Sequence, residues 1–174
     1  IQELEYIESR LKLANEAVEL IHEFEEIIMI EKWMNKNRSD FDRRFPRIAQ
    51  RMNKFMDIDT RNFSIIVAEE FFIVSILTIT SVLTNNIIYW YCILTAFSIH
   101  LIIHFLQFVI WKKYIPAIIT TILCIPYCIF AIEKASYILT FKELFIYAVV
   151  GIIIGAVNLL VMHRFAFNWY KKGQ

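Results

Sequence analysis

All four histidines of this chain lie in apolar helical stretches, together with two adjacent pairs of glutamates. An ionisable side chain deep in a bilayer is costly unless it is protonated, paired or bound to an ion. A bound metal is the simplest way to stabilise so many such groups at once. The groups in question are His22, His100, His104 and His163, with Glu25, Glu26, Glu69 and Glu70.

The spacing of these residues places several of them on common helix faces. His22, Glu25 and Glu26 are three and four residues apart, so at about 100° per residue they share one arc of a helix. His100 and His104 are one turn apart and can present two imidazoles to one ion. We therefore interpret these five residues as metal ligands.

Three further residues belong to the same predicted site. Glu69 and Glu70 point about 100° apart, so one can face the centre of a bundle while the other flanks it. We predict that these two act as catalytic acid or base and that His163 completes the ligand set, with a purely structural hydrogen bond as the alternative for His163. Mixed histidine and carboxylate ligation suits zinc or iron, and it leaves open whether one or two ions bind.

Three other acidic residues of the first helical stretch lie off this face. Glu16, Glu23 and Glu31 are expected to be solvated or to extend toward the membrane surface.

Composition indicates the elements that must position these side chains. The chain has 174 residues, 58% of them hydrophobic, and only three glycines and three prolines. This favours a single all-α integral membrane domain over residues 1–174, a polytopic bundle rather than a soluble fold. A spanning helix needs about 20 mostly apolar residues, and four stretches qualify: 62–83, 87–111, 114–132 and 143–168.

A fifth, N-terminal helix at about 3–35 is too acidic to be selected by hydropathy alone. Charge distribution argues for it, because a spanning first helix places fourteen basic residues on one side and four on the other. Nine of the fourteen lie in a predicted basic cytoplasmic loop, residues 32–61. The positive-inside rule then predicts an outside N-terminus and a cytoplasmic C-terminus, in a bacterial inner (plasma) membrane.

Several short motifs resemble those of one known family. The segment His22-Glu-Phe-Glu25-Glu26 looks like the signature of the HXXEE family of integral membrane proteins. Trp33 follows it as an aromatic residue often does there, and His100 to His104 resembles the family's HxxxH element. The segment from Tyr114 to Thr120, followed by Pro126, resembles its Tyr-x-Pro-Gly-x-x-Thr segment.

The resemblance covers roughly residues 15–165 and has two departures. Ala117 stands where a glycine is usual, and the first helix is more acidic than the segment that commonly precedes the motif. The family has no settled activity, so the resemblance implies a polar site in a membrane protein without implying a reaction.

The leading functional hypothesis is a membrane-embedded, metal-dependent hydrolase or oxidoreductase acting on a hydrophobic, lipid-like substrate. Three alternatives stay open: an ion- or proton-coupled transporter using the same groups, a metal-free glutamate-type intramembrane protease, and an assembly or immunity subunit of a membrane complex. Expected partners are membrane lipid, a hydrophobic small molecule, and a partner subunit or second copy of the chain. Nucleic acid is not expected, because acidic residues interleave the basic loop.

Overall fold

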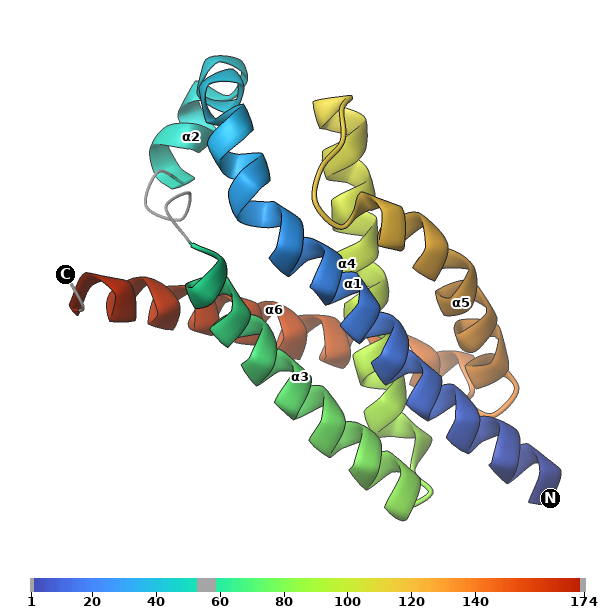
Figure 1. Ribbon diagram of the computed structural model, residues 1–174. Helices are drawn as coiled ribbons and strands as arrows, with labels where there is room; N and C mark the ends of the chain where they lie inside the picture. The colour runs from blue at the N-terminus through green and yellow to red at the C-terminus, as the bar shows by residue number, and fades with distance from the viewer. Residues whose placement is uncertain (1, 53–58, 173–174) are drawn as a thin grey trace.

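The computed structural model describes the backbone of residues 2–52 and 59–172, and side chains within 9–50, 59–162 and 164–165. The described chain is entirely helical with short connections, as predicted (Figure 1). Its helices are α1 (Gln2–Arg44), α2 (Pro46–Met52), α3 (Thr60–Leu83), α4 (Ile87–Trp111), α5 (Ile118–Ser136) and α6 (Phe141–Lys172).

Four of these helices are long and apolar enough to cross a membrane. They are α3, α4, α5 and α6 as far as Met162, with 19 to 25 residues each. At about 1.5 Å per residue such lengths match a hydrocarbon core of about 30 Å. Large aliphatic side chains cover their outer surface, including Ile153 and Ile154 of α6, which are more than half exposed. The length and composition of these four helices are those of an integral membrane protein.

The N-terminal helix α1 lies along α3 (Figure 1). It turns its polar residues inward, and Lys12, Asn15 and His22 are almost fully buried. Its outer face carries apolar side chains at helical spacing, each about half exposed or more: Leu13, Ile21, Phe24 and Ile28. Window hydropathy averages the two faces, which is why α1 looks too polar to span although its outer stripe suits lipid.

One prediction about this region is wrong. Residues 32–61 are not simply a loop, because α1 continues to Arg44 and α2 follows within the same segment. The extension folds over the end of α4: the Trp33 indole donates to the Tyr114 carbonyl at 2.7 Å, and Arg44 donates to the Trp111 carbonyl at 2.8 Å. Phe41 and Phe45 pack on the Trp111 ring. Aromatic residues four apart signal this helical face in the sequence.

The predicted start of the fourth apolar helix is also shifted. The chain turns through residues 112–117, and α5 begins only at Ile118. Ala117 adopts a left-handed conformation with φ 63° and ψ 5°, and its side chain is fully buried. A residue in this left-handed conformation cannot belong to a right-handed helix, so α5 begins after it. Because a Cβ disfavours the conformation, a glycine would suit this position.

Helix α4 holds the centre of the bundle, where Trp90, Leu94 and Leu101 are almost fully buried. Helix α6 packs closely on it through Gly151, at which an added Cβ would collide with the Cys92 carbonyl oxygen. The small-residue spacing Gly151 to Gly155 therefore permits a close helix contact.

Candidate metal centre

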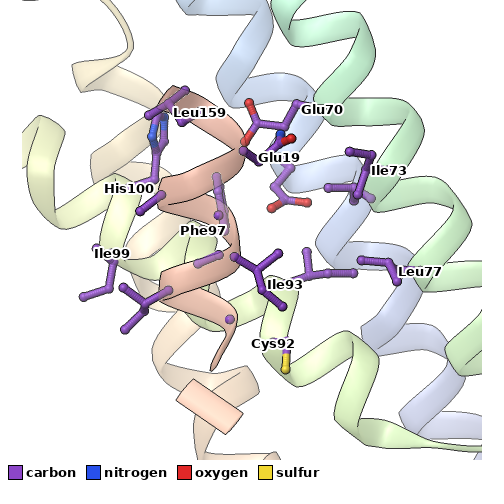
Figure 2. A pocket seen from close by; sticks show the side chains of 18 of the residues that line it. Glu19, Glu70, Ile73, Leu77, Cys92, Ile93, Phe97, Ile99, His100 and Leu159 are labelled. Carbon is purple, nitrogen blue, oxygen red and sulfur yellow. The ribbon is translucent and has the colours of Figure 1, made fainter. Parts of the chain in front are cut away.

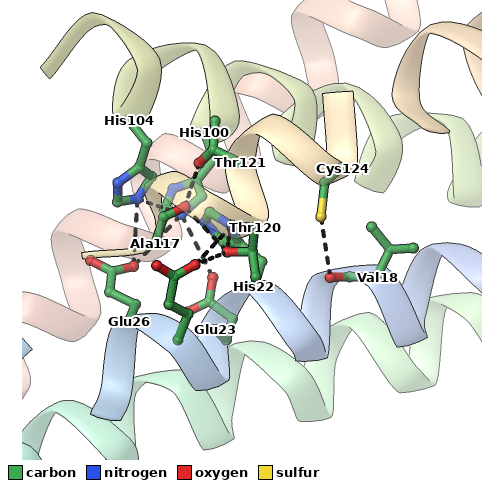
Figure 3. A network of polar contacts seen from close by, with 11 residues as sticks. Val18, His22, Glu23, Glu26, His100, His104, Ala117, Thr120, Thr121 and Cys124 are labelled. Atoms are coloured by element: carbon green, nitrogen blue, oxygen red, sulfur yellow. Dashed lines mark hydrogen bonds and ion pairs between the residues drawn. The ribbon is translucent and has the colours of Figure 1, made fainter. Parts of the chain in front are cut away.

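Four side chains from α1 and α4 converge in the middle of the bundle: His22, Glu26, His100 and His104 (Figure 3). Each helix supplies an i, i+4 pair, which places two side chains on one face. One ligand atom from each of the four residues lies within 4.8 Å of every other. The cluster could hold a metal ion, and it contains four of the six predicted ligands.

The closest approaches within the cluster involve imidazole nitrogens. Nε2 of His104 lies 3.1 Å from Nε2 of His100 and 3.5 Å from Oε2 of Glu26. Oε2 of Glu26 is 3.9 Å from Nε2 of His100. Ligand atoms around a tetrahedral ion at bond lengths of about 2.1 Å are about 3.4 Å apart. These separations therefore match the spacing that one shared ion requires.

His22 is oriented by a hydroxyl on α5. Nδ1 of His22 lies 3.2 Å from the Thr120 hydroxyl oxygen, which itself donates to Oε2 of Glu25 at 2.7 Å. Since the hydroxyl proton goes to Glu25, the hydroxyl oxygen accepts the proton of Nδ1. This tautomer leaves the lone pair on Nε2, which is buried and has no hydrogen-bond partner among the described residues. Such an arrangement suits a metal-binding histidine.

Glu25 has a different environment from Glu26. Its two carboxylate oxygens accept hydrogen bonds from the Thr120 backbone N–H at 2.8 Å and from the Tyr114 hydroxyl at 2.9 Å. A carboxylate is favourable beside the N-terminus of a helix, where backbone N–H groups lack intrahelical partners. Glu25, which was predicted as a ligand, therefore lies at the start of α5 and outside the four-residue cluster.

Glu23 is the residue that sequence reasoning missed. Its side chain is only 14% exposed, and its Oε1 lies 3.6 Å from Nε2 of His100 (Figure 3). The expectation that Glu23 is solvated is therefore wrong. Glu23 lies about 100° around α1 from His22. Because α4 packs against that side of α1, the Glu23 side chain points into the bundle. The sequence of α1 alone does not indicate this orientation.

The other two acidic residues of this group are also engaged by side chains of α3. Glu16 accepts a short hydrogen bond from the Ser75 hydroxyl. Glu31 accepts hydrogen bonds from the Thr60 hydroxyl at 2.6 Å and the Thr60 backbone N–H at 2.9 Å. These hydrogen bonds lower the pKa of Glu31, which lies outside the four apolar spans. Both residues join α1 to α3.

The predicted catalytic residues lie on the α3 side of the site. Glu69 accepts a hydrogen bond at 3.3 Å from Asn158 of α6. Glu70 lines a cavity that His100 and Glu23 also line. Neither residue belongs to the four-residue cluster. His163 lies on α6, but its side chain falls outside the described residues.

The fold and the site define a class: a helical bundle of the membrane-spanning type with a largely buried histidine and glutamate cluster. The chain belongs to the HXXEE family, described as proteins of unknown function with an HXXEE motif, whose model matches residues 14–131. The match includes all four cluster residues and ends before α6. No curated protein and no solved structure matches the chain.

The structure gives the motif a physical meaning. Its first and last residues, His22 and Glu26, enter the cluster, while Glu25 holds the start of α5. Adjacent glutamates point about 100° apart on a helix, so the two acids serve two different neighbours.

Proposed function

We propose that this protein is a membrane-embedded, metal-dependent enzyme acting on a hydrophobic substrate. One observation carries the proposal: His100 belongs both to the four-residue cluster and to the wall of a largely apolar cavity of about 260 Å³. A hydrophobic molecule in that cavity would lie directly beside the ion. Enzyme sites commonly combine an apolar pocket with a few convergent polar groups in this way.

The chemistry of the donor set supports zinc or iron, since imidazole nitrogen and carboxylate oxygen suit both. Four ligand atoms gathered around one point favour a single ion over a dinuclear centre. A bound ion of this kind polarises a carbonyl or activates water. Zinc held by three of the four groups, or iron held by all four with a higher coordination number, would keep a position open for water or substrate.

Glu23 is the best candidate for moving protons at this site. It lies beside His100 and lines the cavity, so it stands between the cluster and a bound substrate. Glu70, which lines the same cavity from α3, is the second candidate. Carboxylates in such positions serve as general acid or base when the reacting group comes within hydrogen-bond reach.

Elemental analysis of detergent-purified protein tests the proposal. We expect about one zinc or iron per chain, lost in His104→Ala and in Glu26→Gln. Glu31→Gln is the matched control, because Glu31 lies on the same helix but contacts Thr60. A protein that folds normally and carries no metal, or that keeps its metal in both cluster variants, would refute the proposal.

A proton or ion relay is the second candidate function. Glu19, Glu23 and Glu70 line the same cavity as His100, and carboxylates near the midplane commonly carry protons in transporters. A relay predicts proton-coupled flux in liposomes that survives removal of metal by a chelator, and the metalloenzyme predicts no such flux.

We also propose a bacterial inner membrane with an outside N-terminus and a cytoplasmic C-terminus. The basic end of α1 and the corner after α4 lie together, since Asp40 pairs with Lys113 at 3.4 Å. This end carries much of the positive charge and should face the cytoplasm. Labelling of a single cysteine introduced at Lys113 by an impermeant reagent, in intact and in opened cells, tests the orientation.

A further inference from the structure

The cavity beside His100 has a polar end and an apolar end. It lies between α1, α3, α4 and α6, and Glu70 and His100 lie toward one end while Leu77 and Cys92 lie toward the other (Figure 2). From His100 to Cys92 is eight residues along α4, about 12 Å at the usual rise. The shape therefore suits a molecule with one polar end and one apolar end.

The size of the cavity favours a single hydrocarbon chain. Its volume of about 260 Å³ is below the roughly 300 to 1,000 Å³ of pockets that hold drug-sized ligands. A lipid with two acyl chains would not fit. Two of the lining residues, Ile103 and Ile154, are 48% and 58% exposed on the outer apolar surface. A chain can thus enter sideways from the lipid.

The polar end has one sign of charge. Glu19, Glu23 and Glu70 line the cavity, and none of the described residues that line it is a lysine or arginine. Carboxyl oxygens accept hydrogen bonds and attract cations. An anionic head group would meet three carboxyl groups, whose combined charge when ionised exceeds that of one divalent ion at the four-residue cluster, in surroundings where uncompensated charge is costly.

We infer that the cavity binds a single aliphatic chain whose polar end donates hydrogen bonds, as in a long-chain alcohol or amine, and disfavours an anionic head group. This inference rests on the proposed function, because the donor head group is the part of the substrate that meets Glu23 and the ion beside His100. The inference narrows the proposed substrates from hydrophobic molecules in general to those whose head group donates hydrogen bonds.

Native mass spectrometry of the detergent-purified full chain tests this inference with three probes of equal chain length that match the length of the cavity: decanol, decylamine and decanoate. We expect the alcohol and the amine to bind at least about tenfold more tightly than the carboxylate, a difference of about 1.4 kcal/mol. Glu70→Gln should reduce the preference for the amine over the carboxylate. Equal or tighter binding of decanoate would overturn the inference.

Pocket-filling variants test the location. Ile73→Trp places a larger side chain in the cavity wall and should abolish binding of decanol and decylamine. Ile76→Trp, on the same helix, is the matched control, because Ile76 is 47% exposed and is not among the cavity residues. Leu77→Trp, at the apolar end, serves if Ile73→Trp does not fold. Binding that persists in a folded filling variant would overturn the inference.

The metal content of the same samples separates the two proposals. Metal without selective binding of the alcohol and amine would contradict only the head-group inference. Selective binding in a protein that carries no metal would contradict the metalloenzyme proposal and leave the cavity chemistry standing.

Discussion

The Thr120 hydroxyl on α5 joins two residues of one motif on α1, since it donates to Oε2 of Glu25 at 2.7 Å and lies 3.2 Å from Nδ1 of His22. Because of this contact, the orientation of a predicted metal ligand depends on a helix far away in the sequence.

Replacing Thr120 by valine should weaken metal binding. Valine keeps the shape of the side chain but removes the hydroxyl that fixes the His22 tautomer. Loss of a partner of this kind typically lowers metal affinity about 10- to 100-fold. Competition with a chelator measures the change, and Thr120→Ser, which retains the hydroxyl, should stay close to the wild type. Equal affinities in the valine variant would show that Thr120 does not orient His22.

Glu25→Gln should affect stability, whereas Glu26→Gln should affect metal binding. Glu25→Gln weakens charge-assisted hydrogen bonds to the start of α5, so we expect a loss of about 1 to 3 kcal/mol in stability with the metal retained. Glu26→Gln should lose the metal. Chemical unfolding and elemental analysis of both variants make the comparison. Loss of metal in Glu25→Gln without loss of stability would place Glu25 among the ligands.

Ala117→Gly should stabilise the protein. The left-handed conformation of Ala117 costs an L-residue about 1 to 2 kcal/mol, and glycine avoids this cost, although it gains some entropy in the unfolded chain. We expect a net gain of about 1 kcal/mol in the free energy of unfolding. Ala131→Gly, at an equally buried position within α5, should instead destabilise the protein.

Gly151→Ala should separate α4 from α6. The new methyl group would collide with the Cys92 carbonyl oxygen, which is backbone and cannot move away without shifting the helix. We expect a loss of about 1 to 3 kcal/mol in thermal or chemical unfolding. Gly155→Ala meets only the Ala96 methyl at 3.1 Å and should be milder. Equal effects of the two substitutions would contradict this packing.

The contact between Glu31 and Thr60 should be sensitive to pH. The pKa of Glu31 is lowered from its ordinary value of 4.5 by the two hydrogen bonds from Thr60. Its contribution to stability is therefore present above about pH 4.5 and is lost as the pH falls through the lowered pKa. The difference in melting temperature between wild type and Glu31→Gln should be visible at pH 7 and should shrink at pH values below the lowered pKa.

Much of the fold was predictable from the chain. The apolar spans were found because about 20 apolar residues in a row have few alternatives to a membrane helix. Four of the six residues predicted as ligands lie together in one cluster, and the i, i+4 spacing that pairs them is a local property of a helix. The prediction of a loop at 32–61 was wrong because it relied on the charges of this segment. The helical spacing of Phe41 and Phe45 was not used, and their partner Trp111 is distant in sequence.

The sequence by itself determined the helices, the family motif and the faces on which His22, Glu26, His100 and His104 lie, since these follow from local spacing along one helix. Only the tertiary structure decided that Glu26 meets the histidines, that Glu25 meets α5, and that Glu23 lies beside His100. Three acidic side chains within four residues point in different directions, and which direction is the interior depends on the helices that pack there. That choice is made by long-range contacts between α1, α4 and α5, which no local pattern contains.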